Sequence, residues 1–231
     1  TTSGTYNYSI SVSAGSTNSL VNGTITITPS PIYLENGICK CPSVSAGETQ
    51  VINGTTYKVV DNSTIAGQIA NENYNLCTTL VTNMSSLFAG NSSFNSNIGS
   101  WDTSNVTTMG DLFQSADNFN QDISGWDVSN VTNMNNMFKY ARSFNQNIGS
   151  WDVSSVTTMS VMFSEADNFN QDIGNWNVTN VNNMFAMFNS ADDFNQDLTG
   201  WCVSNISSVP SQFSTGSELT NSNNPIWGTC D

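Results

Sequence analysis

Aromatic and aliphatic positions recur at a fixed interval along the second half of the chain. One line of tryptophans keeps a spacing of 25 residues at every step, namely Trp101, Trp126, Trp151, Trp176 and Trp201. Two lines of phenylalanine and one of methionine keep the same interval, starting at Phe88, Phe94 and Met84. A period of this length is typical of repeat proteins, in which each unit buries its apolar face against the next one.

Each unit carries two apolar patterns that predict different elements. Between Val131 and Phe138 the apolar residues stand at i, i+3, i+6 and i+7, which is the spacing of one face of a short helix. Further along, Trp151 and Val153 flank Asp152, and this alternation predicts a short strand. The sequence therefore predicts an α/β repeat as the fold class, with one short helix and one short strand in every unit.

The first part of the chain follows other patterns. Alternating apolar residues on either side of Asn22–Gly23 predict two β-strands. The Asn53–Gly54 pair between β-branched runs predicts a hairpin at 51–60, and Ser63 or Thr64 is expected to cap a short helix. The predicted regions are 1–31, the β segment; 32–75, a connector and N-terminal cap; 76–213, the repeat array; and 214–231, a C-terminal disulfide cap.

The charge of the chain limits the possible partners. Four Lys and Arg residues stand against 18 Asp and Glu residues, which gives a formal net charge of -14. Such a chain repels a phosphate backbone, so nucleic acid is not expected as a partner. No run of about 18 apolar residues is present, so we expect no membrane-spanning segment.

The five cysteines lie towards the two ends of the repeat array, and none stands in the central run 78–201. Cys202 occupies the position after the last repeat tryptophan and is expected to pair with Cys230. Cys77 stands one period before Asp102, and either Cys39 or Cys41 could be its partner. This placement predicts structural disulfides and an oxidising compartment, with one thiol left over.

Two stretches of the repeats carry a family resemblance. The units FNQDISGWDVSNVTNMNNMF and FNQDIGNWNVTNVNNMFAMF resemble the BspA-like, mycoplasma-lipoprotein-type leucine-rich repeats of bacterial surface proteins, over about residues 76–230. The resemblance implies a right-handed leucine-rich-repeat solenoid, an outer-surface or secreted location, and no catalytic residues. In the N-terminal segment, SGTYNYSISVS and VNGTITITP resemble the last strands of Ig-like modules from Bacteroidetes adhesins.

Stacked acidic positions are the first candidate site. Asp102, Asp127 and Asp152 share one position of the repeat and are expected to point outward, one strand spacing apart. Such carboxylates repel one another, so Ca²⁺ is a possible ligand, although solvated side chains are the preferred interpretation. A second acidic line comprises Asp122, Asp172 and Asp197. Asparagines recur in a further line, starting at Asn95, and are expected to form a ladder of buried amides.

Positions that depart from the repeat are the second candidate site. Tyr140, Val161 and Phe185 replace small or polar residues in successive units, and Lys139 and Arg142 lie beside Tyr140. An exposed patch of aromatic and cationic side chains would suit a binding partner, whereas sequence drift would explain the same departures without a function.

The function expected from the sequence is non-covalent recognition. The chain has no histidine and no glycine-rich phosphate loop, so we expect neither an enzyme nor a cofactor. The interpretation is an extracellular, secreted or cell-surface adhesin-type module that recognises a protein or a glycan. The alternatives are a passive spacer within a large adhesin, or cargo of a secretion machinery.

Overall fold

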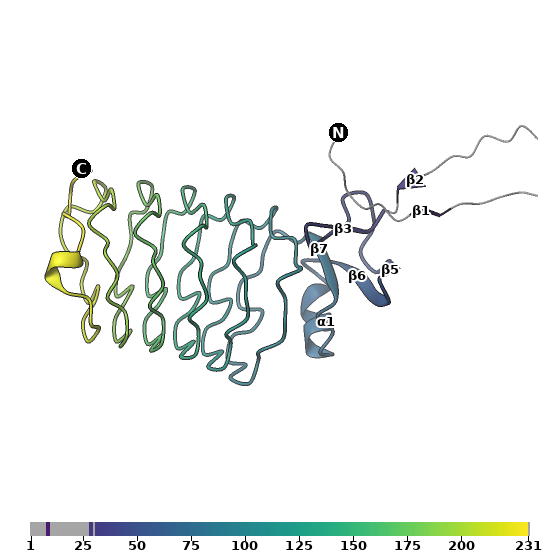
Figure 1. Ribbon diagram of the computed structural model, residues 1–231, viewed down its shortest axis with the longest axis horizontal. Coiled ribbons are helices and arrows are strands. Elements are labelled where there is room, and N and C mark those ends of the chain that lie inside the picture. Colours follow the sequence, from purple (N-terminus) through teal and green to yellow (C-terminus); the bar gives the residue numbers. More distant parts are fainter. Residues whose placement is uncertain (1–7, 10–27, 30, 231) are drawn as a thin grey trace, which may run out of the picture.

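The computed structural model describes residues 8–9, 28–29 and 31–230. Short strands and one helix gather at the N-terminal end, and a row of similar coils extends from them to the C-terminus (Figure 1). Strands β1 (Tyr8–Ser9) and β2 (Thr28–Pro29) pair antiparallel. The remainder of the two strands expected within residues 1–31 lies outside the described residues.

The N-terminal cap consists of two hairpins and one crossover. Strand β3 (Tyr33–Glu35) pairs with β4 (Ile38–Lys40), and β5 (Thr49–Ile52) pairs with β6 (Thr55–Asp61), both antiparallel. Each hairpin turns through an Asn-Gly pair with positive φ at both residues, as a two-residue β-turn of this hand requires. Strand β7 (Leu76–Leu80) then joins β6 in parallel after the helix α1 (Ile65–Ala70).

Helix α1 begins after one of the two predicted capping residues. Thr64 is the N-cap residue, but its side chain makes no capping hydrogen bond. The carboxylate of Asp61 accepts instead, from the N–H groups of Ser63 and Thr64, each at 3.0 Å. A carboxylate at this place also suits the positive end of the helix dipole.

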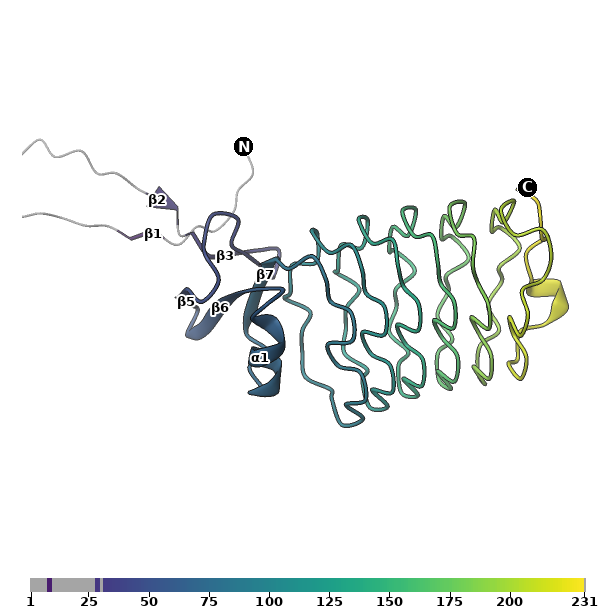
Figure 2. The ribbon, with the colours of Figure 1, turned by 180° about the vertical axis from the view of Figure 1, so that it is seen from behind.

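The predicted α/β repeat, a right-handed leucine-rich-repeat solenoid with a helix and a strand in each unit, is wrong. Across residues 81–220, all of which are described, the chain forms turns and isolated bridges, with no α-helix and no continuous strand. Figure 2 shows these coils from behind as a stack of open loops. No leucine-rich-repeat architecture is therefore assigned to the array.

Hydrogen bonding explains why the helical spacing does not give a helix. The N–H of Asn136 donates to the carbonyl of Ser160 in the next unit at 3.0 Å, and alternate residues from Met134 to Tyr140 do the same. The N–H groups of Met137 and Lys139 donate three residues back, as Met137 does to Met134 at 3.3 Å, and that of Asn135 donates to Asn133 Oδ1 at 2.9 Å. An α-helix would use all of these groups internally. Positive φ values at Asn136 and Tyr140, 54° and 61°, also exclude a continuous right-handed helix.

Neighbouring coils are joined at equivalent positions. Isolated parallel bridges link Asn83 to Thr108 and continue through Asn133 and Thr158 to Asn183. Indole groups add a second connection, since Trp151 Nε1 donates to the carbonyl of Ile123, 28 residues earlier, at 3.3 Å. Each coil therefore depends on its neighbour for main-chain and side-chain partners.

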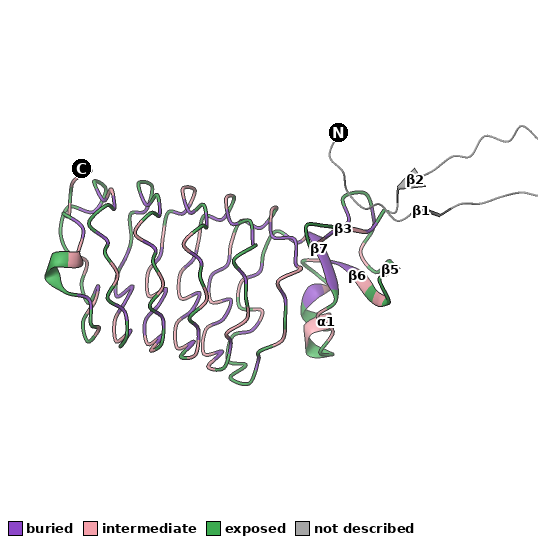
Figure 3. Cartoon of the chain, viewed as in Figure 1, coloured by how far each residue is buried: buried purple, intermediate pink, exposed green. Residues whose placement is uncertain are grey.

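The recurring apolar lines form one continuous core. All the tryptophans of the 25-residue line are buried, and Figure 3 shows buried residues alternating with half-buried and exposed ones around the coils. Phenylalanine rings stack both within and between coils: the centroids of Phe138 and Phe144 are 4.0 Å apart, and those of Phe138 and Phe163 are 5.5 Å apart. A separate, smaller core under the N-terminal cap contains Cys39, Cys41 and Cys77.

The asparagine ladder is present, but it lies at the surface and not in the interior as predicted. Asn120 Oδ1 accepts from the N–H of Asn145 at 3.0 Å and from Gln146 Nε2 at 2.8 Å. The same pair of bonds recurs at the equivalent residues of neighbouring coils. These side chains are exposed or half-buried because they bond along the outside of the stack.

Disulfides lie at both ends of the stack. Cys39 bonds to Cys77, which selects between the two partners that the sequence left open, and Cys202 bonds to Cys230 beyond the 3-10 helix η1 (Asn221–Asn223). Cys41 is a free, buried thiol. The helices within the described ranges are too short to cross a membrane.

Candidate functional site

A cavity lies between the β3–β4 hairpin and the first coils of the stack. Its volume is about 370 Å³, and it is neither fully enclosed nor flat. The hairpin contributes four lining residues and the coils contribute five: Glu35, Asn36, Ile38, Lys40, Trp101, Asp102, Thr103, Gly125 and Asp127. Residues far apart in the sequence therefore form one concave site.

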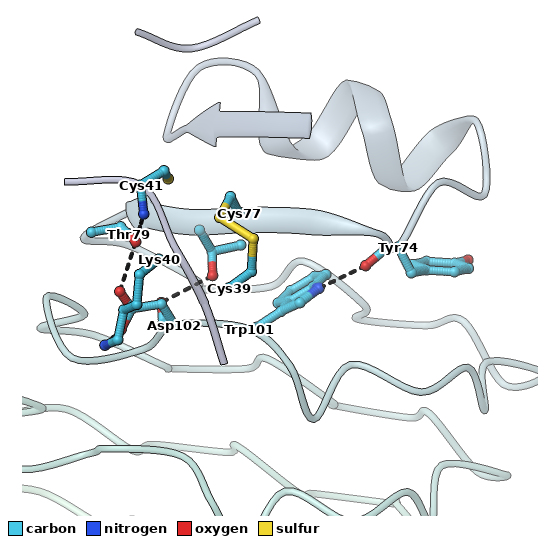
Figure 4. The surroundings of a disulfide bond; sticks show 9 residues. Cys39, Lys40, Cys41, Tyr74, Cys77, Thr79, Trp101 and Asp102 are labelled. Atoms are coloured by element: carbon cyan, nitrogen blue, oxygen red, sulfur yellow. Dashed lines mark hydrogen bonds and ion pairs between the residues drawn. A yellow bond between two sulfur atoms is a disulfide. The ribbon is translucent and has the colours of Figure 1, made fainter. Parts of the chain in front are cut away.

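Asp102 is buried at this site and does not point into solvent as predicted. Its carboxylate accepts from Lys40 Nζ, from Thr79 Oγ1 and from Ser104 Oγ, each at 2.7 Å. Figure 4 shows Lys40 and Thr79 around this carboxylate, beside the Cys39–Cys77 disulfide. Burial alone would raise the pKa of Asp102, but the hydrogen bonds from Lys40, Thr79 and Ser104 outweigh it and hold the pKa below its usual value.

Two further carboxylates of the cavity lack a cationic partner. Glu35 ends strand β3, Asp127 follows Trp126 in the stack of coils, and both are exposed. Asp127 Oδ1 accepts from the N–H and Oγ of Ser129, at 3.0 and 2.6 Å. In the described part of the chain, no Lys or Arg pairs with either carboxylate. Three carboxylates against the one ammonium of Lys40 leave the cavity with two negative charges.

The predicted patch around Tyr140 exists, but its cations are engaged. Lys139 Nζ lies 5.0 Å from the centre of the Tyr140 ring and Arg142 Cζ lies 5.5 Å from it. Arg142 also pairs with Asp117 at 3.3 Å and with Asp167 at 3.5 Å. Burial raises the pKa of Asp167, and Arg142 opposes this shift. The patch is therefore a cation held among carboxylates, and it offers no excess of positive charge.

Val161 and Phe185 come together on neighbouring coils. The N–H of Val161 donates to the carbonyl of Phe185 at 2.8 Å, and the Phe185 side chain is 42% exposed. Tyr140 bonds to Ser164, and no hydrogen bond, ion pair or ring contact between described residues connects it to Val161 or Phe185. The three departures from the repeat thus form two surface features and not one.

The remaining acidic positions hold turns. Asp152 accepts from the N–H of Ser154 at 3.0 Å, and hydrogen bonds from Ser154 lower its pKa. Asp122 and Asp197 likewise accept from the N–H group of the residue two positions later, and hydrogen bonds from that residue lower their pKa values. Within the described ranges, no group of three or more Asp, Glu, Cys or His residues is placed to hold a metal ion. Ca²⁺ binding by Asp102, Asp127 and Asp152 remains a prediction.

The sequence contained one unused signal for the cavity. Asn36–Gly37 lies between two short apolar runs and forms the turn of the β3–β4 hairpin, with φ of 51° and 85°. This is the same dipeptide signal that predicted the second hairpin. Glu35, Asn36 and Gly125 were not identified because their contact spans about ninety residues of sequence.

Comparison with known families identifies a family for the chain. A family model described as "Mycoplasma protein of unknown function, DUF285" matches residues 57–156 and 125–227. The chain belongs to this DUF285 family. The match runs from strand β6 through the stack to the C-terminal cap, so the DUF285 region contains the coil wall of the cavity but not the β3–β4 hairpin. No curated protein and no solved structure matches the chain.

Proposed function

We propose that the chain is an extracellular recognition module, which binds a protein or a glycan of another surface without chemical change. The observation that carries this proposal is the cavity between the β3–β4 hairpin and the coils. A volume of about 370 Å³ is near the lower end of the range of ligand sites, about 300–1,000 Å³. Residues from two parts of the chain converge on it, as in a binding site.

Preorganised walls support this proposal. The N–H of Cys39 donates to the carbonyl of Ser100 at 2.8 Å, and Lys40 pairs with buried Asp102. The Cys39–Cys77 disulfide fixes the same hairpin to strand β7. Because both walls are held before a ligand arrives, little conformational entropy is lost on binding.

The proposed location rests on the cysteines and on the finer resemblances. Two disulfides favour an oxidising, extracellular compartment. The similarity of the repeats to BspA-like surface proteins, and of residues 1–31 to Ig-like strands of Bacteroidetes adhesins, belongs to this proposal. The proposal includes no catalysis and no cofactor, on the ground that the chain has no histidine.

The experiment blocks the cavity with a side chain that the backbone tolerates. Gly125 lines the cavity and an added Cβ there meets no atom within 4 Å, so Gly125→Phe introduces a bulky side chain at this wall without a clash at Cβ. Gly200 occupies the same repeat position three units later, where the nearest atom would be 3.7 Å away, and Gly200→Phe is the matched control. The full chain is applied to arrays of extracellular proteins and of glycans. We expect wild type and Gly200→Phe to retain a common ligand that Gly125→Phe loses.

A passive spacer is the second candidate function, and one observation about the architecture favours it. The phenylalanine stack is continuous from Phe88 to Phe188, and disulfides lie at both ends, as a rigid element without a ligand would need. Absence of any bound array ligand, or equal binding by the two phenylalanine variants, would reject the cavity as the recognition site and favour the spacer.

A further inference from the structure

The chemistry of the cavity indicates which ligand group it takes. We propose that it binds the cationic side chain of a lysine or arginine presented by a partner protein. This inference rests on the proposed function and makes it specific for a charge class. The partner's cation would lie near Glu35 and Asp127, the two carboxylates of the cavity without a counter-ion.

Asp102 is excluded as the recognition group. Its two oxygens are occupied by Lys40, Thr79 and Ser104, and the residue is only 2% exposed. Lys40 is therefore neutralised inside the protein and does not repel an incoming cation strongly. The two exposed carboxylates remain as the groups that attract a cation, one on the hairpin wall and one on the coil wall.

The apolar part of the cavity suits the stem of such a side chain. Ile38 lines the hairpin wall and is partly exposed. Lysine and arginine bury their methylene groups along apolar surface while the charged end stays near polar groups. A lysine or arginine therefore matches both the carboxylates and the apolar wall.

A sugar matches the cavity less well. Sugar rings are usually held against exposed aromatic faces, and the aromatic residue of this cavity, Trp101, is fully buried. The Trp101 Nε1 group is also engaged, since it donates to the carbonyl of Tyr74 at 2.9 Å. The net charge of -14 adds a long-range attraction for cationic partners.

Small probes test the inference directly on the whole chain. Nα-acetyl-lysinamide and Nα-acetyl-argininamide are titrated by NMR, and the amide shifts of Asn36 and Gly125 report binding. Nα-acetyl-norleucinamide has the same stem without the charge, and glucosamine represents an amino sugar. We expect dissociation constants on the order of millimolar for the cationic amides, and at least about tenfold weaker binding of norleucinamide.

Charge-neutral variants give the second arm. Asp127→Asn keeps its turn, because Asn177 at the same repeat position accepts from Thr179 in the same way. Combined with Glu35→Gln, it is expected to weaken binding of the cationic amides about tenfold. Asp152→Asn is the matched control for the Asp127→Asn change: it removes one charge from the same repeat position one coil away, outside the cavity.

Three outcomes would overturn the inference. These are glucosamine binding without binding of either cationic amide, equal binding of norleucinamide, and a double variant that loses no more than Asp152→Asn. If Gly125→Phe still abolished an array ligand in any of these cases, recognition by the cavity would stand and only its charge class would be wrong. Thermal melting of each variant confirms that it is folded.

Discussion

Residues at one repeat position perform one task, and an exception shows what the task contributes. Asn130 Nδ2 donates to the carbonyl of Ser104 at 2.8 Å, and Asn180 and Asn205 donate in the same way to the preceding coil. Asn105 at the start of the stack donates to Thr79 of strand β7. Ser155 occupies this position in the coil between them. Its side chain is too short for the same bond, so this line of amide-to-carbonyl hydrogen bonds is interrupted at one coil.

Ser155→Asn is expected to restore the missing hydrogen bond. The new amide would reach the carbonyl of Ser129, the residue equivalent to the acceptors above, and should raise the free energy of unfolding by about 0.5–1 kcal/mol. For a chain of this size that corresponds to a rise in Tm of about 1–4 °C by calorimetry. Asn130→Ser is the reverse change and should lower stability by a similar amount. Equal melting temperatures of wild type and both variants would show that these amide-to-carbonyl hydrogen bonds do not contribute to stability.

The free thiol of Cys41 is expected to be unreactive in the folded chain. The residue is fully buried, and burial raises the pKa of its thiol, so little thiolate is present or accessible. Labelling with iodoacetamide should be slower than for an exposed thiol by about a thousandfold or more, since it requires local opening. In guanidinium, without reductant, one thiol per chain should react, and Cys41→Ser should remove that signal. Rapid labelling under native conditions would argue against this burial.

At the scale of elements, the chain shows how far sequence patterns reach. The apolar lines at 25-residue spacing form the core, and the Asn53–Gly54 signal gives the β5–β6 hairpin. The helical spacing between Val131 and Phe138 was misleading, because it records which side chains face the core and not where the N–H groups bond. The ion pair of Lys40 with Asp102 joins residues 62 apart, a contact that no local pattern contains.

That ion pair connects the β3–β4 hairpin to the first coil, and its loss is expected to be costly. Lys40→Met leaves Asp102 buried without its cation, which should lower the free energy of unfolding by about 2–4 kcal/mol near neutral pH. Adding Asp102→Asn should recover part of the loss, because the uncompensated charge disappears. Urea unfolding of the three chains measures this, and additive losses would contradict a direct coupling.

The pH dependence of the same pair follows from the lowered pKa of Asp102. A carboxyl whose folded pKa is depressed stabilises the fold above its unfolded pKa of about 3.9, and this contribution is lost as the pH falls through the folded value. The difference in stability between wild type and Asp102→Asn should therefore be constant from pH 7 to about pH 5 and shrink below about pH 4. A difference that persists unchanged into stronger acid would show that packing, and not charge, is the cause.

At the scale of the whole molecule, stability is a sum over contacts between neighbouring coils. The main-chain bonds that leave a coil go to the units about 25 residues before and after it, and the aromatic stacks follow the same register. A repeat protein of this kind gains or loses whole layers without disturbing the rest, provided that the register is kept. The register, more than any individual contact, should therefore decide whether a shortened chain folds.

Two deletions that differ by one residue test this. Removing residues 151–175 takes out one period and joins Ser150 to Trp176, so every remaining residue keeps its repeat position, and Asp192 replaces Asp167 beside Arg142. This chain should fold with buried tryptophans, a cooperative transition and a smaller urea m-value, because less surface is exposed on unfolding.

Removing residues 151–174 shifts every later residue by one position, which places polar residues in the core lines. We expect that chain to lose the cooperative transition and to show solvent-exposed tryptophan fluorescence. If both chains folded equally well, the coils would be independent of one another, and the hydrogen bonds between them would contribute little to the stability of the stack.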